Sequence, residues 1–597
     1  MYETLHLAFL KQAENFKKDT ALMYKKRGRY RDISWNEFRL NVKNVSLGLT
    51  SLGIKKDDKV AVLSENRPEW AYADLGILCI GAINVPIYPT NTEEEVFYIL
   101  KDTSCETIFV SDKDHLNKIL LIKKRLKSLK HIIFFDADKQ RIPGVISFKE
   151  FIKTGRMLER QKPYLFEELI NRPVKEDVAT IIYTSGTTGP PRGVMLTHEN
   201  FLSNIRACFD IFPIGKTDIA LSILPLSHVF ERMAGYYFML MKGAQIAYAE
   251  SFGKVRKNIG EIRPTVMCAV PRFFENVYTK VLDTVIKAPF FKKQFMLWAI
   301  NVGREFSHEK LDLHRVSPLT LTEYFIANKM VLSYLRKSLG GRIRFFVSGG
   351  APLSKEIAEF FYAAGILILE GYGLTETSPV ITVNRIDTFK FGTVGKPIPN
   401  VKVRIAEDGE ILTKGNHIMK GYFKKPCETK EVVKRGWFHT GDIGRLDRDG
   451  FLVIIDRKKD IIITSGGKNV APQNIENLLR TDRYISNVMV YGDRKKYLTA
   501  LVVPDFKNIQ GYARYKKIDF KNISGLVKEP KIYDFIKRRI DKKSICLASY
   551  ERIRKFILLD KDFSQKEGEL TPTLKVKRKF VSEKFKDLLD SLYAEKP

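Results

Sequence analysis

Short apolar runs alternate with amphipathic segments through the first 180 residues, and this alternation constrains the fold more than any other feature of the chain. Residues 59–63, 83–87 and 107–110 are rich in β-branched side chains and short enough to be buried strands. The amphipathic segments between them predict helices that cover the strands. The sequence therefore predicts an α/β fold built in layers.

The same rhythm continues in two later segments. Residues 178–183 predict a strand that runs into a Gly/Thr-rich loop, followed by a helical pattern from His198 onward. Residues 342–347 predict a strand before a helix that ends at Gly365. We expect both to be strand–loop–helix units. Residues 280–340 carry helix formers and clustered aromatics without a strand signal, which predicts an inserted helical layer.

A chain of 597 residues exceeds the roughly 250–300 residues at which single cores stop growing, so at least two domains are expected. The charged run at 456–460 lies between two apolar runs and is typical of a hinge. We expect a large N-terminal α/β domain over 1–456, with the helical insert at about 280–340. A small, mobile α+β domain is expected over 457–597, with a hairpin formed by 488–491 and 498–503.

Several protein classes are disfavoured by composition. The six cysteines form no CxxC pair and have no neighbouring His tract, so neither a disulfide framework nor a zinc site is expected. The N-terminus lacks the basic and apolar regions of a signal peptide. The most apolar stretch, 75–85, is about half of the roughly 20 residues that a membrane span needs. A cytoplasmic location is expected.

The chain is strongly basic, with 101 Lys and Arg against 69 Asp and Glu, which gives a net charge of +32. Such a field attracts polyanions, among them ATP, coenzyme A, anionic lipid and nucleic acid. The alternative is a lysine excess spread over a solvated surface, because no block of like charge dominates. The sign of the charge alone does not choose between these explanations.

The segment 183–194, Tyr-Thr-Ser-Gly-Thr-Thr-Gly-Pro-Pro-Arg-Gly-Val, is the most informative stretch. Its glycines allow tight backbone turns, its hydroxyl side chains can surround phosphate oxygens, and Arg192 adds a fixed positive charge. We interpret it as a polyphosphate-binding loop, against the alternative of a Gly/Thr-rich surface turn. It is not a Walker A loop, because the spacing Gly-x-x-x-x-Gly-Lys-Ser/Thr does not fit.

This segment resembles the phosphate-binding signature of the adenylate-forming (AMP-binding) superfamily. Five further segments match the superfamily in order: Leu-Pro-Leu-Ser-His at 224–228, Gly-Gly-Ala-Pro at 349–352, Glu-Gly-Tyr-Gly-Leu-Thr-Glu-Thr at 370–377, Trp-Phe-His-Thr-Gly-Asp at 437–442 with Asp-Arg at 456–457, and Leu-Thr-Pro-Thr-Leu-Lys at 570–575. The variants at 345–352, 456–469 and 570–575 resemble the long-chain acyl-CoA synthetase branch.

The resemblance implies an ATP-dependent long-chain-fatty-acid–CoA ligase with ATP, Mg²⁺ and coenzyme A as substrates and cofactor. The fatty acid would first become acyl-AMP with release of pyrophosphate, and its acyl group would then pass to coenzyme A. The alternatives are an adenylation enzyme that serves a carrier protein, and an inactive scaffold that binds membranes. Peripheral contact with anionic lipid at the inner face of the cell membrane is expected, and nucleic acid is not. A homodimer is left open.

The nucleotide-binding residues are carried over from the superfamily motifs. The matching positions are Thr184, Ser185, Gly186, Thr187, Thr188, Gly189 and Arg192 for the phosphates, Gly350, Ala351, Pro352, Glu370, Gly371, Tyr372, Gly373 and Thr375 for the adenine region, and Asp442 and Arg457 for the ribose. Outside these motifs, Asp442 and Arg457 would be interpreted as surface charges. Tyr372 offers a flat ring for the base.

The resemblance also implies the catalytic positions. Lys575 would stabilise charge on the α-phosphate during adenylation, and the alternative is a basic tail that continues through 577–579. Thr184 and Glu376 would hold Mg²⁺, although Glu376 alone would be interpreted as an exposed carboxylate. His228 would border the acid's carboxylate, against the alternative of a core histidine.

The remaining assignments concern chain binding and motion. Phe274 matches a position where some long-chain relatives carry a gating Trp, and we expect the aromatic insert at 280–340 to wall an acyl tunnel. Lys459 matches the hinge position, and Gly466 and Gly467 would face coenzyme A. The chain departs from many relatives at Arg192, where they carry Lys, and before Lys575, where they carry Gly.

Overall fold

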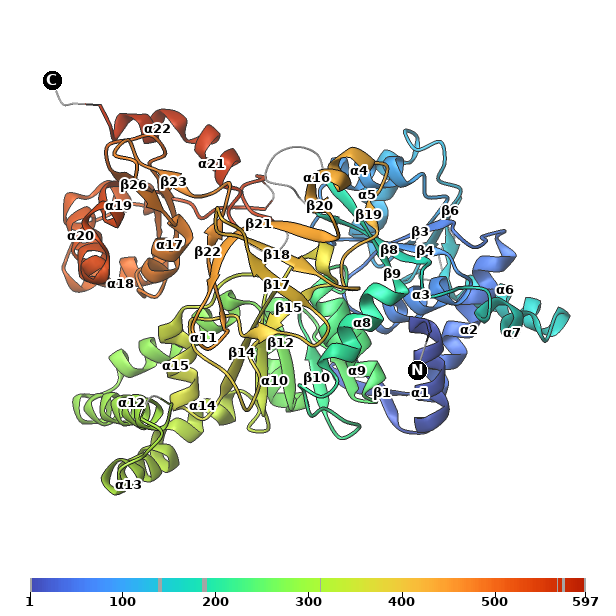
Figure 1. Cartoon of the computed structure of the whole chain (residues 1–597), viewed down its shortest axis with the longest axis horizontal. Coiled ribbons are helices and arrows are strands. Elements are labelled where there is room, and N and C mark those ends of the chain that lie inside the picture. The colour runs from blue at the N-terminus through green and yellow to red at the C-terminus, as the bar shows by residue number, and fades with distance from the viewer. Residues whose placement is uncertain are drawn as a thin grey trace.

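The computed structural model describes residues 3–137, 142–184, 191–311, 313–565, 567–571 and 575–594. Two large sheets lie beside each other in the N-terminal part, and a smaller body formed by the C-terminal residues lies at one end (Figure 1). The predicted mixed α/β class is confirmed.

The first sheet has eight strands, and its central members lie where the sequence predicts them. Their spatial order is Gly421–Tyr422 (β19), Arg192–Thr197 (β9), Val178–Thr184 (β8), Ile83–Ile87 (β4), Lys59–Leu63 (β3), Thr107–Val110 (β5), His131–Phe134 (β6) and Ile146–Ser147 (β7). In β3, Val60 and Val62 face one apolar cluster while Ala61 and Leu63 face another. Burial on both faces explains why every residue of this strand after Lys59 is apolar.

Helices cover both faces of this sheet. One layer consists of Leu5–Phe16 (α1), Trp35–Ser51 (α2), Pro68–Cys79 (α3), Phe148–Gln161 (α6), Leu165–Ile170 (α7), His198–Cys208 (α8) and Phe238–Met241 (α9), and the other of Glu93–Thr103 (α4) and Lys113–Lys123 (α5). Ser147 caps α6 and Thr92 caps α4, each paired with a glutamate three residues later. These capping boxes fix where the helices begin.

The second sheet has nine strands. Their order is Lys396–Pro397 (β16), Val380–Val383 (β15), Leu367–Gly373 (β14), Phe345–Ser348 (β13), Val266–Ala269 (β12), Ile219–Ser222 (β10), Gln245–Tyr248 (β11), Thr20–Lys26 (β1) and Arg29–Ser34 (β2). The cluster that includes α1, α2 and α8 also contains Ala220 of β10 and Phe345 of β13. The two sheets therefore share one central core layer.

The outer face of the second sheet carries helices. These are Val255–Ile262 (α10), Pro271–Lys287 (α11), Phe290–Leu311 (α12), Pro318–Ala327 (α13), Ser333–Ser338 (α14) and Lys355–Ala363 (α15), with a π-helix at Asn328–Leu332 between α13 and α14. The structure is thus helical over the predicted insert, and α15 is followed by Gly365 with φ of 77°. Figure 1 shows α12 and α13 projecting from the body of the molecule.

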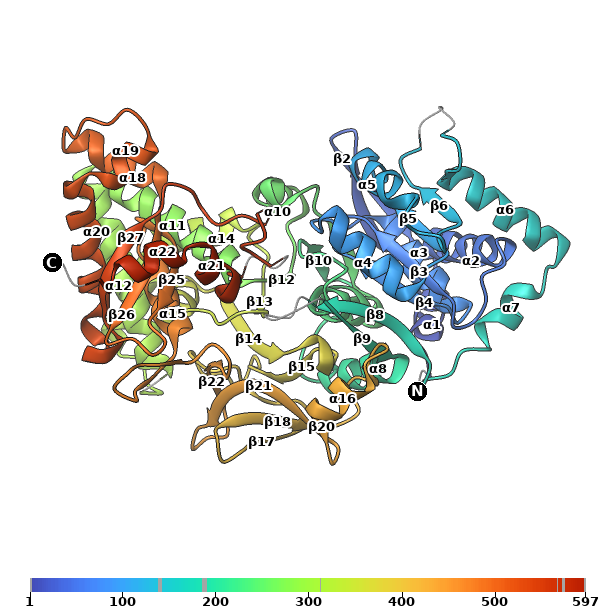
Figure 2. The ribbon, with the colours of Figure 1, turned by 90° about the horizontal axis from the view of Figure 1, so that it is seen from above.

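A five-stranded sheet lies along one side of the N-terminal part, at the bottom of Figure 2. It contains Lys402–Ile405 (β17), Glu410–Lys414 (β18), Val433–Lys434 (β20), Trp437–Leu446 (β21) and Leu452–Arg457 (β22), with Pro426–Val432 (α16) beside it. In the antiparallel pair β21–β22, Asp442 lies opposite Arg457. This register places two of the predicted ribose-binding residues next to each other.

The C-terminal part is a separate α+β unit. Ile485–Tyr491 (β25) and Leu498–Pro504 (β26) form the predicted hairpin, and Ile553–Leu558 (β27) completes the sheet. Around it lie Ile462–Ile463 (β23), Asn469–Val470 (β24), Pro472–Arg480 (α17), Phe506–Tyr515 (α18), Ile523–Lys528 (α19), Pro530–Lys543 (α20), Arg578–Lys584 (α21) and Lys586–Ser591 (α22). No hydrophobic cluster in the described part of the chain mixes residues 5–438 with residues 462–589.

One local prediction is wrong. Residues 178–208 form strand, loop, strand and helix instead of strand, loop and helix, because β9 follows the Gly/Thr-rich loop and pairs antiparallel with β8. Thr184 lies opposite Arg192 in this pair. The described residues on either side of 185–190 are therefore paired with each other.

Candidate active site

A cavity of about 730 Å³ lies where the two large sheets, the five-stranded sheet and the C-terminal part meet. Thirteen of the predicted site residues line it: Thr184, Arg192, His228, Gly350, Ala351, Gly371, Tyr372, Gly373, Thr375, Glu376, Arg457, Lys459 and Lys575. Residues 185–189 of the predicted phosphate loop lie outside the described residues. The structure thus brings together side chains separated by up to about 390 positions in the sequence.

Strand ends build the polar wall of the cavity. Tyr372, at the end of β14, donates a hydrogen bond from its hydroxyl to Asp442 Oδ2 at 2.6 Å. Arg457 Nε lies 3.5 Å from Asp442 Oδ1. Asp442 itself is buried directly behind this wall, and burial raises the pKa of its carboxyl. An aromatic side chain, a carboxylate and a guanidinium are therefore linked at the wall by one hydrogen bond and one ion pair.

The loop at 349–353 forms a second part of the wall. Gly350 has φ of 82°, a conformation that favours glycine. Glu370 and Pro352 do not line the cavity. Glu370 accepts a hydrogen bond from the backbone N–H of Leu353 at 3.3 Å, and burial raises the pKa of Glu370 to about 8. This glutamate therefore supports the loop from behind.

The phosphate side of the cavity contains a chain of charged and aromatic groups. Arg192 Nε lies 2.6 Å from Glu428 Oε2, and its guanidinium lies over the ring of Tyr422 at 5.4 Å. The hydroxyl of Tyr422 donates to Glu376 Oε1 at 2.9 Å. Burial raises the pKa of Glu376. The sequence contained no signal for Tyr422 or Glu428, because neither belongs to a motif.

Lys575 reaches the cavity from the C-terminal part of the chain. The backbone N–H of Thr571 donates to the carbonyl of Lys575 at 2.8 Å. Burial, together with the nearby Arg457, lowers the pKa of Lys575 to about 8. Asp442 and Asp460 act in the opposite direction. The ammonium form therefore predominates at pH 7 and is lost as the pH rises above about 8.

His228 also lines the cavity, together with the apolar Val229 and Phe230 that follow it in the sequence. The backbone N–H of Phe230 donates to His228 Nδ1 at 3.2 Å, so the proton of the neutral ring resides on Nε2. Burial lowers the pKa of His228 to about 4, which keeps the ring neutral near pH 7. Asn66 holds the preceding segment, since its amide donates to Leu224 O at 2.6 Å and accepts from Leu226 N–H at 2.8 Å.

Beyond His228 the cavity becomes apolar. Its walls there include Cys208, Phe212, Ile214, Met233, Phe238, Met239, Phe345 and Val383. These side chains come from α8, α9, the second sheet and the segments beside them, and we call this part of the cavity the apolar arm. None of the described residues of 280–340 lines it, so the expectation of a tunnel walled by the insert is wrong.

Phe274 does not line the cavity either. Its side chain is fully buried and contacts Phe273, Phe346 and Phe361 in the core beneath α11. Helical position explains the difference, because Pro271, Arg272 and Glu275 occupy the face of α11 that borders the cavity. The gating assignment for Phe274 is therefore not supported by its position.

The predicted hinge and glycine loop occupy different environments. Lys459 lines the cavity within a turn closed by a hydrogen bond from Asp460 N–H to Arg457 O at 2.9 Å. Gly466 and Gly467 do not line it, and nothing lies within 4 Å of a Cβ built at either position. In this arrangement the glycine loop is open to solvent.

Polar contacts hold the C-terminal part against α11 and α15. Arg272 Nη1 donates to Ser486 O at 2.9 Å. Arg483 Nη2 lies 2.9 Å from Asp283 Oδ1. Lys543 Nζ lies 3.2 Å from Glu356 Oε2. These contacts hold the C-terminal part in the arrangement in which Lys575 lines the cavity.

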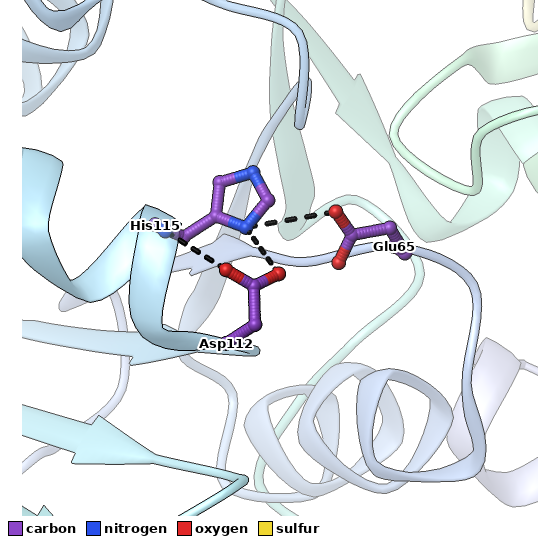
Figure 3. Close-up of side chains that lie close together, drawn as sticks. All are labelled: Glu65, Asp112 and His115. Carbon is purple, nitrogen blue, oxygen red and sulfur yellow. Dashed lines mark hydrogen bonds and ion pairs between the residues drawn. The ribbon is translucent and has the colours of Figure 1, made fainter.

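A cluster outside the motifs supports the cavity from the first sheet (Figure 3). His115 Nδ1 lies 2.7 Å from Asp112 Oδ2 and 3.6 Å from Glu65 Oε1, and these groups are close enough together to hold a metal ion. His115 Nε2 lies 3.0 Å from the carbonyl oxygen of Pro89. Tyr88, the residue before Pro89, lines the cavity. The contact of His115 with Pro89 therefore fixes a segment at the edge of the cavity.

Comparisons with known families match almost the whole chain. A model of the family described as AMP-binding enzyme matches residues 9–423. A second model, described as AMP-binding enzyme C-terminal domain, matches residues 459–597.

Relatives with curated names match over similar lengths. The long-chain-fatty-acid–CoA ligase FadD15 of Mycobacterium bovis is 34% identical over 572 residues, which cover 95% of this chain and 93% of the relative. The long-chain-fatty-acid–CoA ligase ACSBG2 of Xenopus laevis is 31% identical over 627 residues, which cover 99% and 84%.

Solved structures share the fold at lower identity. The anthranilate CoA ligase AuaEII in complex with anthranoyl-AMP has a TM-score of 0.73 and 18% identity, with coverage of 98% of this chain and 97% of the other. The A domain of carboxylic acid reductase from Segniliparus rugosus, in complex with AMP and a co-purified carboxylic acid, has a TM-score of 0.77 and 21% identity, with coverage of 99% and 94%.

Proposed function

Because the chain belongs to the AMP-binding enzyme family, we propose that it is a long-chain-fatty-acid–CoA ligase. It activates a long-chain fatty acid with ATP to acyl-AMP, releases pyrophosphate, and then transfers the acyl group to coenzyme A with release of AMP. One observation carries this proposal: Lys575, Tyr372 and Arg457 line one cavity together with the apolar arm, and Asp442 contacts both Tyr372 and Arg457 from behind the wall.

Adenylation is the first step. Asp442 and Arg457 bind the ribose, Tyr372 stacks on the adenine, and Gly350 and Ala351 approach its edge. Lys575 stabilises the negative charge that builds on the α-phosphate as the carboxylate attacks, while the neutral His228 donates from Nε2 to the acid. Arg192 contacts the departing pyrophosphate. No side chain of the protein forms a covalent intermediate.

The residues at the phosphate side suit Mg²⁺. A carboxylate at Glu376 and a hydroxyl at Thr184, both at the cavity wall, are the hard oxygen donors that this ion prefers. Bound there, Mg²⁺ would neutralise phosphate charge. Tyr422 orients the Glu376 carboxylate through its hydroxyl, and the ion would favour the ionised form of this buried acid.

Thioester formation is the second step, and it needs a different arrangement. We propose that residues 1–456 and 457–597 are two domains that rotate about Lys459. The separation of the hydrophobic clusters into 5–438 and 462–589 supports this division. Rotation withdraws Lys575 and brings Gly466 and Gly467 to the cavity, where their missing side chains leave space for the pantetheine arm of coenzyme A.

The test of this function is pyrophosphate release from palmitate and ATP, measured with and without coenzyme A. The proposal requires release in both cases and multiple turnovers only with coenzyme A. Sustained turnover with an acyl-carrier protein or an amine, and none with coenzyme A, would show that the enzyme serves another acceptor. Absence of pyrophosphate release with every acid would show an inactive scaffold.

Chain length is expected to control kcat/KM strongly. Each methylene that enters the apolar arm contributes about 0.8 kcal/mol, a factor of roughly four, until the arm is filled. The measurement is kcat/KM for a series of acids from acetate to a C20 acid. A higher value for acetate or for an aromatic acid than for palmitate would contradict the long-chain assignment.

The pH dependence of adenylation is expected to report Lys575. The free enzyme carries this lysine charged below a pKa of about 8, so kcat/KM should be level below that pH and fall about tenfold per unit above it. Neutral His228, with a pKa of about 4, should add no change between about pH 5.5 and 7. The profile is measured by pyrophosphate release.

Lys575→Arg is the matched control for this profile, because a guanidinium stays charged across the range. It should lower the rate and remove the alkaline fall. An alkaline fall that persists unchanged in Lys575→Arg would assign the titration to another group.

We also propose peripheral attachment to an anionic membrane. The substrate and product are amphiphilic, and the net charge of +32 would favour anionic lipid. In the part of the chain that the structure describes, no helix combines the length and the apolar composition that crossing a bilayer requires.

A further inference from the structure

Exposed apolar side chains are concentrated on the helical insert. Of the 25 large hydrophobic side chains that are exposed in the described residues, 11 lie between residues 286 and 334. They are Ile286, Phe290, Phe291, Leu297, Leu313, Leu319, Leu321, Phe325, Ile326, Met330 and Tyr334, and we call this set the insert surface. A stretch of 49 residues, about a twelfth of the chain, thus carries almost half of them.

The helix α13 carries the densest part of this surface. Only Thr320 and Ala327 are buried in it, whereas Phe325 is 66% exposed and Leu319 is 71% exposed. The exposed Ile326, Met330 and Tyr334 follow at intervals of four residues, which places them along one side of the helical segment. Figure 1 shows α13 at the periphery of the molecule.

The insert surface is separate from the substrate cavity. No described residue from 276 to 344 lines the cavity. An acyl chain bound in the cavity would therefore not cover these side chains. A concentration of exposed apolar side chains on one peripheral segment indicates a site that binds an apolar partner.

The charge of the insert indicates what kind of partner the insert surface binds. Residues 286–337 contain nine Lys and Arg and four Asp and Glu, and 9 − 4 gives a net charge of +5. Lys287, Lys292, Lys329 and Lys337 are exposed beside the apolar side chains. Apolar side chains bordered by lysines are the pattern of a helix that lies in a membrane interface, with its lysines among anionic headgroups.

We propose that the insert surface docks on an anionic lipid bilayer. The apolar side chains of α13 enter the boundary between headgroups and acyl chains, and the neighbouring lysines contact lipid phosphates. The proposal locates the membrane attachment that forms part of the proposed function and relies on it for the class of partner.

The test compares two triple variants in sedimentation with vesicles of phosphatidylglycerol and phosphatidylcholine. The first, Leu321→Ser, Phe325→Ser and Met330→Ser, removes apolar groups from the insert surface. The control, Leu121→Ser, Met157→Ser and Tyr164→Ser, removes three apolar side chains elsewhere that are 66%, 59% and 79% exposed, against 55%, 66% and 55% for the insert residues. The insert variant should bind vesicles at least about tenfold more weakly than wild type, and the control should bind like wild type.

A third variant separates charge from apolar insertion. Lys287→Gln, Lys292→Gln and Lys329→Gln should remove most of the preference for vesicles that contain phosphatidylglycerol over pure phosphatidylcholine, and should reduce the sensitivity to salt. Circular dichroism checks that each variant is folded. Because all of these positions lie outside the cavity, pyrophosphate release in vesicle-free solution should match wild type in every variant.

Three results would overturn the proposal: unchanged vesicle binding by the insert variant, equal losses in the insert and control variants, or binding that ignores phosphatidylglycerol. If ultracentrifugation showed a wild-type dimer that only the insert variant dissociates, with vesicle binding unchanged, the insert surface would be a contact between two copies. A further outcome separates the two proposals. If the vesicle binding is as expected but neither the wild type nor any variant releases pyrophosphate, the docking surface is supported and only the enzymatic proposal is refuted.

Discussion

Replacement of Lys575 with alanine is expected to slow acyl-AMP formation by about 10²- to 10³-fold and to leave transfer from preformed acyl-AMP to coenzyme A within about twofold. Lys575 lines the cavity beside Arg457, where charge develops only while the α-phosphate is attacked. In the second step no such charge builds there. The two half-reactions should therefore respond very differently to one substitution.

Measurement of each half-reaction decides this prediction. Pyrophosphate release reports the first, and thioester formation from synthetic acyl-AMP reports the second. Lys579→Ala is the matched control, since this lysine lies four residues away in α21 and is exposed. Equal losses in both half-reactions of Lys575→Ala would mean that the lysine maintains structure instead of acting on the transition state.

Lys459→Pro is expected to produce the opposite division, with loss of thioester formation by more than about 100-fold and adenylation retained in part. Proline fixes φ, and rotation about Lys459 requires φ or ψ to change. In the present arrangement Lys459 is the third residue of the turn that Asp460 N–H closes onto Arg457 O. Proline at this position also disfavours the helical conformation of Lys458, which is why adenylation should fall somewhat.

Lys459→Ala is the control, because it removes the same side chain and leaves the backbone free. It should run both half-reactions at nearly wild-type rates. If folded Lys459→Pro also did so, the hinge would lie elsewhere or the second step would need no rotation.

The core strands were predictable because their burial on both faces leaves a local signature. The run at 59–63 is apolar at every position except its first, and the structure places alternate side chains in two clusters. The hairpin of β25 and β26 was predictable for a related reason, since a short polar turn separates two apolar runs. Burial of a whole strand is thus visible in its own residues.

Other features depend on contacts between distant segments and left no local signal. Strand β9 pairs with β8 across the Gly/Thr-rich loop, and its sequence, Arg-Gly-Val-Met-Leu-Thr, begins with residues that also suit a loop. The support of Glu376 by Tyr422 joins positions 46 residues apart. Phe274 was misplaced because a motif position does not state which face of a helix borders a cavity.

The polar contacts between the C-terminal part and helices α11 and α15 have a kinetic consequence. A partly exposed pair such as Lys543–Glu356 contributes about 0–1 kcal/mol, whereas the Arg483–Asp283 pair is more buried. No hydrophobic cluster of the described residues bridges the two parts. Domain motions take about microseconds to milliseconds, and typical turnover takes about 1 ms to 1 s. A large apolar interface at this place would separate more slowly than a few polar contacts. Under the proposed rotation, we therefore expect that separation of the two parts does not limit the rate of acyl transfer.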